Sequence, residues 1–216
     1  MFYKPRGLIT ANRDAHRPTV FDCFPPAMCD THFAVGRLDR DTEGLLLITD
    51  DGPLCAALLH PSHHVPKTYE FYAIGVIDEE KITHLTGGLS IDEGRSLTRP
   101  AVLSVLSVCE LGDILPFLSP ADAKRARNHL HTPVVHATLT VTEGKKHQVR
   151  RMLRAVLCHI VWLKRISMGT LSLDGTLSPG IYRPLTEEEE KSLRSSARVA
   201  DDREKNEKTK KYRKNG

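Results

Sequence analysis

Asp39 lies in the segment VGRLDRDTEGLLLITDDG, residues 35–52, where it follows one predicted strand and precedes another that is strongly apolar. Arg37 and Arg40 flank it. A loop held at both ends by buried structure is a good position for a reactive group. An ionised carboxylate there could act as a nucleophile or stabilise developing positive charge. The ordinary alternative is that Asp39 caps a turn and pairs with a neighbouring arginine.

Further carboxylates nearby raise the alternative of a two-carboxylate hydrolase. Asp41 is two residues after Asp39, and Asp50 and Asp51 end the next predicted strand. A glycosidase needs two carboxyl groups at a set separation across a sugar ring. Trp162 is the single tryptophan, and no other feature of the sequence indicates carbohydrate binding. A nuclease or glycosidase would need a metal cluster or a second placed carboxylate, and the sequence indicates neither.

The segment TEGKKHQVRRM, residues 142–152, predicts a positive site at the start of a helix. Lys145 and Lys146 precede the helix, arginines occupy its first turns, and the helix N-terminus adds positive potential. A phosphate group fits such a site. Arg150 could also act as a bidentate partner that holds a nearby carboxylate ionised. The alternative is a surface helix with ordinary arginines.

The segment KTYEF places Lys67 and Tyr69 two residues apart on a predicted strand, so they share one face. A tyrosine beside a base-binding site can stack on a flat ring and offer its phenol as an acid or base. The alternative is a tyrosine that belongs to the core or to a strand edge.

The remaining pattern predicts an α+β fold with a mixed, largely antiparallel sheet. Strands are expected at residues 1–10, 33–39, 44–49, 67–77, 100–111, 134–144 and 160–168. Helices are expected at 53–60, 78–88 and 147–157, and after a capping box of Thr186 and Glu189. The third helix rests on an apolar stripe of Val149, Met152, Leu153, Val156 and Leu157. Short connections favour this fold over a doubly wound one, and residues 112–133 are expected to form an inserted loop with one helical turn.

Positive charge is concentrated in two parts of the chain, although the net charge is only +4. Residues 143–165 contain seven basic residues and one acidic residue. Residues 198–216 contain eight basic and four acidic residues and almost no apolar ones, so we expect a disordered tail. This distribution suits a polyanionic partner.

Composition also argues against several other classes of protein. No apolar run approaches the roughly 18 residues that span a bilayer, and the N-terminus has no signal-peptide pattern, so a cytoplasmic protein is expected. Five cysteines without a CxxC pair predict reduced, mostly buried thiols. His60, His63 and His64 lie close together, but no carboxylate or cysteine completes a ligand set, so no metal is expected.

Five strings of the sequence together resemble the motifs of the RsuA-type ribosomal RNA pseudouridine synthases, the group of RsuA, RluB, RluE and RluF. They are YKPRG, GRLDRDTEGLLLITDDG, KTYEF, EGKKHQVRRM and GIYRPLTEEE, in the family's order over residues 1–190. The resemblance implies a pseudouridine synthase fold, with two α/β subdomains flanking a catalytic cleft. It also implies an isomerase that converts a ribosomal uridine into pseudouridine without a cofactor.

The resemblance assigns roles to individual residues. Asp39, the aspartate of GRLD, is the catalytic carboxylate. Tyr69, the tyrosine of KxY, stacks on the target base and transfers a proton, and Arg150, the first arginine of QVRRM, pairs with the carboxylate. Contacts to the RNA around the target uridine are expected from Lys4, Arg37, Arg40, Lys67, Lys145, Lys146, Gln148, Arg151 and Arg154.

The sequence departs from the family's pattern in two regions. The first motif begins at residue 3, so the N-terminal S4-like domain of many members is expected to be absent. The catalytic domain is then residues 1–197, with the insertion at 112–133, and the tail at 198–216 could serve as an RNA tether. The insertion resembles RluE-like enzymes of the large subunit, whereas HPSHHVPKTY and SLTRPAVL resemble the small-subunit RsuA type, so the subunit stays open.

Two other functions stay open as alternatives: a non-catalytic RNA-binding or ribosome assembly module, and the same chemistry on tRNA. The expected partner is ribosomal RNA, free or within an assembly intermediate. The enzyme is expected to act as a monomer without contact to a membrane.

Overall fold

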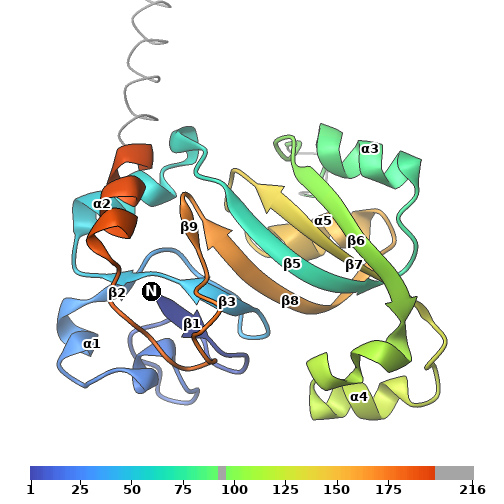
Figure 1. Ribbon diagram of the computed structural model, residues 1–216, viewed down its shortest axis with the longest axis horizontal. Helices are drawn as coiled ribbons and strands as arrows, with labels where there is room; N and C mark the ends of the chain where they lie inside the picture. The colour runs from blue at the N-terminus through green and yellow to red at the C-terminus, as the bar shows by residue number, and fades with distance from the viewer. Residues whose placement is uncertain (92–95, 198–216) are drawn as a thin grey trace, which may run out of the picture. The chain divides into compact units, whose positions relative to one another are not determined.

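The computed structural model describes residues 1–91 and 96–197 (Figure 1). The strands are β1 (Phe2–Lys4), β2 (Phe33–Ala34), β3 (Glu43–Leu46), β4 (Ile48–Thr49), β5 (Lys67–Ile74), β6 (Val102–Glu110), β7 (Pro133–Val141), β8 (His159–Met168) and β9 (Leu171–Ser172). The α-helices are α1 (Met28–Thr31), α2 (Gly52–Leu59), α3 (Glu79–Gly87), α4 (Pro120–Ala126) and α5 (Gln148–Ala155), and a further helix covers residues 187–197. The 3₁₀-helices are η1 (Val20–Cys23), η2 (Pro61–His63) and η3 (Leu111–Phe117).

The main sheet has the strand order β1-β3-β8-β5-β7-β6, with β9 beside β8, and β2 pairs with β4 separately. The pairs β1–β3, β6–β7 and β8–β9 are antiparallel, and Phe2 lies opposite Leu46 in the first of them. The prediction of an α+β fold with a mostly antiparallel sheet is therefore confirmed. The chain forms two compact units: unit 1 contains Met1–Lys67 and the chain from Arg165 onward, and unit 2 is Thr68–Lys164.

Unit 1 has its own hydrophobic core, to which β3, α2 and the helix at 187–197 contribute Leu45, Leu58 and Leu193, each at most 1% exposed. The predicted strand 44–49 is divided here into β3 and β4, which have different partners. The carbonyl of Leu47, between them, accepts a hydrogen bond of 2.8 Å from the amide of Val35. The chain therefore changes pairing partner at Leu47, which a run of apolar residues cannot reveal.

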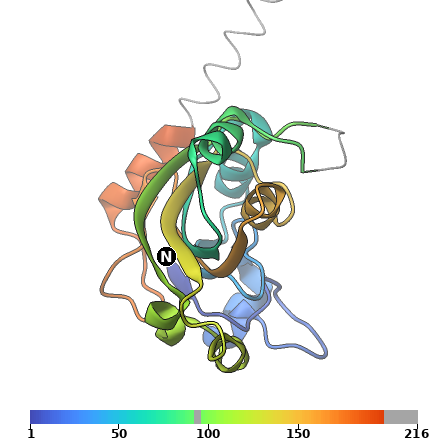
Figure 2. The same ribbon diagram turned by 90° about the vertical axis from the view of Figure 1, so that its right-hand side faces the viewer.

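Unit 2 has a core formed by one face of its strands together with α3 and α5. Figure 2 shows α5 against one face of these strands, with α3 and α4 near their opposite ends. Phe71 of β5, Leu85 of α3 and Met152 of α5 are fully buried in this core. The apolar stripe predicted for α5 is confirmed as far as Val156. The prediction that Leu157 also belongs to this stripe is wrong. That side chain is 86% exposed because the helix ends at Ala155 and Leu157 has a φ of +60°.

The segment predicted as an inserted loop, residues 112–133, is instead largely helical. It contains most of η3 and all of α4, and Ile114 and Ala126 pack with Val134 in a small hydrophobic cluster of unit 2. Ser119 caps α4 by accepting a hydrogen bond of 3.1 Å from the amide of Asp122. The helices are short, so their apolar positions do not produce a clear period in the sequence.

The helices predicted from residues 53 and 78 and after Thr186 are confirmed, and a side chain caps the start of each. Asp51 accepts the amide hydrogen bond of Leu54 at the start of α2, and Asp78 accepts that of Lys81 at the start of α3. Thr186 and Glu189 form the reciprocal capping box before the helix at 187–197. The predicted disordered tail at 198–216 lies outside the described residues.

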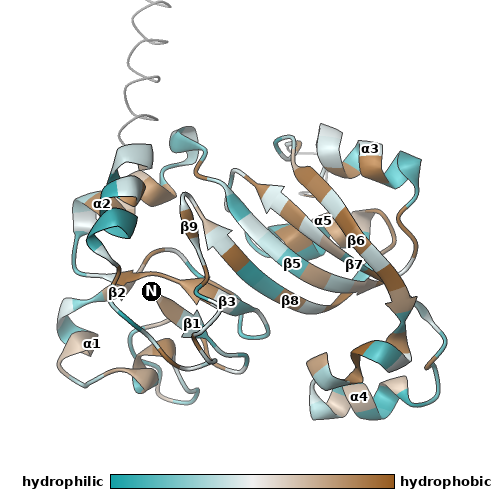
Figure 3. Cartoon of the chain, in the orientation of Figure 1, coloured by the Kyte–Doolittle hydropathy of each residue, from teal (hydrophilic) through white to brown (hydrophobic). Residues whose placement is uncertain are grey.

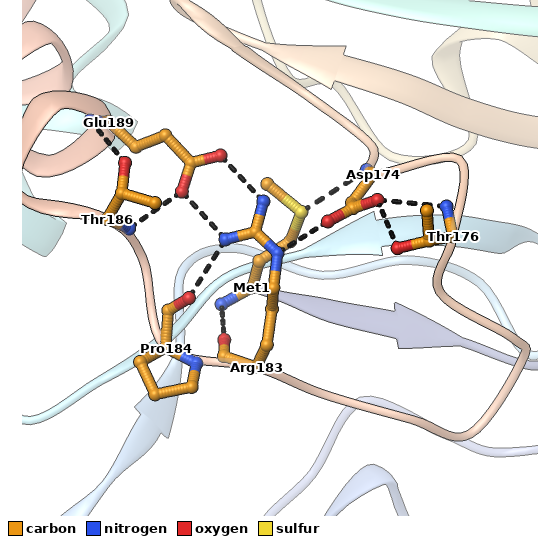
Figure 4. A network of polar contacts seen from close by, with 7 residues as sticks. All are labelled: Met1, Asp174, Thr176, Arg183, Pro184, Thr186 and Glu189. Carbon is orange, nitrogen blue, oxygen red and sulfur yellow. Dashed lines mark hydrogen bonds and ion pairs between the residues drawn. The ribbon is translucent and has the colours of Figure 1, made fainter.

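Arg183 is the centre of a polar network that fastens the end of unit 1 (Figure 4). Its guanidinium contacts Glu189 through two nitrogens, at 2.7 and 2.8 Å, and Asp174 at 2.6 Å. Its carbonyl accepts a hydrogen bond of 2.8 Å from the amino group of Met1. The guanidinium is the main reason why the pKa of Glu189 is lowered to about 2. The contact between Arg183 and Glu189 therefore contributes its full stabilisation only while Glu189 is ionised.

We expect Glu189→Gln to lower the stability at pH 7 by about 1 kcal/mol, the value of one such interaction, and to reduce acid sensitivity. The folded pKa of Glu189 lies below its ordinary value of 4.5, so its contribution is complete above about pH 4.5 and disappears toward pH 2. Urea denaturation at several pH values should show the two stability curves converging as the pH falls. Glu188→Gln, at an exposed position, is the matched control. A constant difference between the curves would contradict this role.

Candidate active site

The loop that carries Asp39 is fixed in unit 1 by hydrogen bonds on both sides of the aspartate. Before it, the hydroxyl of Thr10 donates to the carbonyl of Leu38 at 2.8 Å and accepts from its amide at 3.1 Å. After it, the amide of Thr42 donates to the carbonyl of Asp39 at 3.1 Å. Leu38 and Thr42 are buried, whereas Asp39 is half-buried. The backbone is therefore anchored around a side chain that stays accessible.

Lys4 provides the central anchor of this loop. Its ammonium is completely buried and donates to the carbonyls of Thr42 at 2.8 Å, Pro5 at 3.0 Å and Arg40 at 3.4 Å. Burial lowers the pKa of Lys4 to about 8, and the nearby carboxylates, of which Asp39 is the strongest, partly oppose that shift. The predicted RNA contact of Lys4 is therefore wrong, because its ammonium is enclosed and bonded to the backbone.

Steric constraints explain why position 44, in the TEGLLL segment, is a glycine. Gly44 has a φ of +105°, and a Cβ at this position would overlap the carbonyl oxygen of Arg165 in β8. Arg165 is itself buried and donates from Nε to the carbonyl of Leu45 at 2.8 Å. Gly44 and Arg165 were not predicted from the sequence to support this loop, and Lys4 was predicted to contact RNA instead. The sequence signals that could have revealed the roles of Lys4 and Gly44 are the string YKPRG and the glycine in TEGLLL.

Tyr69 lies in unit 2 on the face of β5 that carries Phe71 and Ala73. It is half-buried and packs against the core of unit 2, to which α5 also contributes. Lys67, just before it in the chain, is buried and donates to the carbonyl of Val65 at 2.9 Å. Its pKa is lowered to about 8 by burial and by the charge of Arg165. The predicted RNA contact of Lys67 is therefore wrong as well.

The start of α5 positions Arg150, which is half-buried. Gln148 is buried, donates to Glu143 at 2.7 Å and accepts the amide hydrogen bond of Lys145 at 3.0 Å. It stabilises the turn before the helix, so its predicted RNA contact is wrong. The ammonium of Lys145 donates to the hydroxyl of Ser96 at 2.8 Å.

The other predicted RNA contacts are accessible. Arg37 and Arg40 are exposed in unit 1, and Lys146 and Arg154 are exposed in unit 2. Arg151 is half-buried. Their contacts to RNA stay predictions.

The three predicted catalytic residues belong to different units. Asp39 lies in unit 1, whereas Tyr69 and Arg150 lie in unit 2. Within unit 2, the strand of Tyr69 and the helix of Arg150 share one core. The pairing of Arg150 with Asp39 stays a prediction.

Among residues 1–91 and 96–197, no group of three or more His, Cys, Asp and Glu side chains could hold a metal ion. The five cysteines are free, but only Cys158 is buried, so the prediction of mostly buried thiols is wrong for the other four. In the part of the chain that the structure describes, no helix is both long and apolar enough to cross a bilayer.

Comparisons with known proteins agree with the fold and the motifs. Residues 1–155 match the family model described as RNA pseudouridylate synthase. The chain is 42% identical to the uncharacterized RNA pseudouridine synthase YtzG of Bacillus subtilis, over 88% of this chain and 70% of that protein. It is 34% identical to ribosomal small subunit pseudouridine synthase A of Escherichia coli, over 88% of this chain and 71% of that protein.

Solved structures give the same result. A crystal structure of pseudouridylate synthase matches with a TM-score of 0.72 and 31% identity, over 89% of this chain and 71% of that one. The archaeal box H/ACA sRNP Nop10–Cbf5 complex matches with a TM-score of 0.53 over 83% of this chain. Its identity is 14%, so it supports the fold alone. The chain belongs to the RNA pseudouridylate synthase family. It is an RNA pseudouridine synthase, which is an isomerase.

We expect Lys4→Met to lower kcat about 10- to 100-fold with little change in KM, because small displacements of a reacting group have effects of this size. The variant leaves the carbonyls of Pro5, Arg40 and Thr42 without their buried donor. Steady-state kinetics on a substrate RNA would measure both constants. Lys191→Met, at an exposed position, is the control. A higher KM with unchanged kcat would contradict this anchoring role of Lys4.

Proposed function

We propose that this enzyme converts a specific uridine of ribosomal RNA into pseudouridine without a cofactor, and that Asp39 is its catalytic carboxylate. The observation that carries the proposal is the anchoring of the Asp39 loop by Lys4, Thr10 and Thr42, which fixes the backbone around a half-buried carboxylate. A reactive group needs this kind of support, because catalysis depends on a position held within a fraction of an ångström.

The proposed reaction requires one carboxylate and a way to hold a detached base. The bond between C1′ of the ribose and N1 of uracil breaks, the ring turns, and a bond from C1′ to C5 forms. The proton on C5 is then removed and N1 carries a proton, so the product is an isomer of the substrate. Bond breakage develops positive charge on the sugar, which ionised Asp39 would stabilise or trap covalently.

Tyr69 and Arg150 take supporting parts in the proposed chemistry. Tyr69 would stack on the uracil ring and serve as the proton-transfer group for C5. Its packing against the core of unit 2 gives it a fixed orientation. Arg150 would keep Asp39 ionised through a charge-assisted hydrogen bond.

Access to the uridine requires that it leave its stack, and contacts to flanking phosphates would supply that energy. The exposed cations Arg37, Arg40, Lys146 and Arg154 suit this role, together with Lys145 and Arg151. Ribosomal RNA is the proposed substrate because related proteins are named ribosomal small subunit pseudouridine synthase A. The enzyme would act as a monomer on free ribosomal RNA or on an assembly intermediate.

We expect cells that lack this protein to lose one pseudouridine from ribosomal RNA. The wild-type protein should restore the modification, and Asp39→Asn should not, because an amide cannot act as the nucleophile or stabilise a cation. Chemical mapping of pseudouridine across ribosomal RNA and tRNA would measure this. Asp41→Asn, two residues away, is the matched control. Restoration by Asp39→Asn would refute the catalytic assignment, and a loss confined to tRNA would refute the ribosomal substrate.

We expect Arg150→Met to reduce kcat by at least about 100-fold, with a much smaller effect on RNA affinity, because a lost charge partner acts on the reaction rather than on binding. Arg154→Met on the same helix should show the opposite pattern, with a higher KM and a nearly unchanged kcat. Single-turnover rates and filter binding would separate the two effects. An affinity loss alone in Arg150→Met would place this residue among the phosphate contacts.

A further inference from the structure

The end of α4 presents an exposed cluster of basic side chains in unit 2. Lys124, Arg125 and Arg127 follow one another closely at this end, and the side chain of Arg125 is 83% exposed. These residues belong to the segment predicted as a loop, and no catalytic role was assigned to any of them. Figure 3 shows hydrophilic and hydrophobic residues side by side on α4.

The acidic side chains around α4 are already occupied by local contacts. The carboxylate of Asp122 accepts a hydrogen bond of 2.6 Å from the hydroxyl of Ser119. The other oxygen of this carboxylate is 3.6 Å from Nη1 of Arg125, which is a long distance for an ion pair. Asp113 accepts from the amide of Glu110 at 2.9 Å, and the Glu110 carboxylate contacts His131 at 2.7 Å. The positive charge at the end of α4 is therefore only weakly neutralised.

Two of these cations have no acidic partner in the part of the chain that is described. Lys124 and Arg127 make no ion pair within residues 1–91 and 96–197. Arg13 and Arg17, in contrast, are exposed arginines of unit 1 that contact Asp30 and Asp14. Exposed cations without acidic partners attract a polyanion most strongly, because no local charge has to be displaced.

An exposed aromatic side chain lies just before α4 in the chain. Phe117 ends η3 three residues before α4, and it is 42% exposed. Its ring lies 5.1 Å from that of Tyr72 and 5.4 Å from that of Trp162. Tyr72 also stacks on His136 at 4.4 Å. Phe117 is therefore the exposed member of a packed aromatic cluster, and an unpaired base could stack on such a ring.

We propose that this surface, which consists of Phe117, Lys124, Arg125 and Arg127 and is here called the basic α4 surface, binds the substrate RNA at a distance from the target uridine. Tyr69 faces the core shared with α5, whereas Tyr72 and Ile74 face the opposite side of β5 and pack with η3 and α4. Strand geometry separates Tyr69 from Ile74 by about 16 Å along β5. This inference rests on the proposed function, because it takes the bound RNA to be the substrate of the enzyme.

RNA fits the basic α4 surface better than a protein partner does. Three close cations neutralise phosphates, and one fixed aromatic ring offers a stacking face for any base. Such a surface binds with little sequence preference and adds affinity rather than catalysis. It would therefore help to hold a large, folded RNA, and a short fragment around the uridine would not reach it.

The test compares Lys124→Ala/Arg125→Ala/Arg127→Ala with the control Arg13→Ala/Arg17→Ala/Lys191→Ala, which removes the same charge from other exposed positions. Two RNAs are used: a full small-subunit ribosomal transcript, and a short hairpin around the mapped target uridine. The α4 variant should bind the transcript about tenfold more weakly at 50 mM salt. The slope of log affinity against log salt should be shallower by about 2, since three contacts contribute roughly 0.7 each. Hairpin binding and kcat at saturating hairpin should equal those of the control.

A second variant addresses the aromatic contact. Phe117→Leu keeps an apolar side chain but loses the ring, so it should weaken binding to the transcript several-fold without changing the salt slope. Thermal denaturation of each variant would show that the fold is retained. If Phe117→Leu binds as the wild type does, the stacking part of the proposal is wrong.

Several results would overturn the inference. Equal binding of the transcript by the α4 variant and the control would remove the surface from RNA binding. A lower kcat on the hairpin would place it in the catalytic machinery. A defect seen only with ribosomal particles, and not with naked transcript, would indicate a protein partner. If the wild type modifies another RNA class, the proposed function fails, and the same comparison with that RNA still decides the role of the basic α4 surface.

Discussion

The buried ammonium of Lys4 holds the backbone on which Asp39 depends. Three carbonyl groups, from Pro5, Arg40 and Thr42, converge on one side chain that has no contact with water. A buried charge is costly unless it is fully hydrogen-bonded, and these carbonyls offset part of that cost. The lowered pKa of Lys4, to about 8, reflects the remainder. Movement of the loop would leave the ammonium or the carbonyls unsatisfied, so the arrangement resists displacement.

Strand β3 begins directly after the Asp39 loop and helps to hold Lys4, the anchor of that loop, in place. β3 pairs with β1, which carries Lys4, so the strand that follows the loop is hydrogen-bonded to the strand that anchors the loop. Gly44 allows the backbone to approach Arg165 more closely than any side chain would permit. Arg165 then donates to the carbonyl of Leu45 from a buried position. Polar groups inside unit 1 therefore fix the loop geometry, while apolar packing around Leu45 and Leu58 supplies the surrounding stability.

In unit 2 the two faces of the strands are covered by different elements and support different residues. One face packs against α3 and α5 and includes Tyr69, so the residues proposed for base recognition rest on the largest core of this unit. The other face supports η3 and α4 through a smaller cluster with Tyr72 and Ile74. A rigid strand that is covered differently on its two faces can position chemistry on one and an accessory surface on the other.

Local patterns in the sequence determined much of this protein. The helix caps at Asp51, Asp78 and Thr186, the alternating strand β7 and the apolar stripe of α5 depend on neighbours within a few residues, so periodicity and capping chemistry predict them. The motif around Asp39 was also visible, together with the class of enzyme. Tertiary structure alone decided the roles of Lys4, Lys67 and Gln148, which were predicted to contact RNA and are buried with backbone or side-chain partners. Whether a charged side chain meets solvent depends on segments distant in the chain, and one-dimensional spacing does not contain that information.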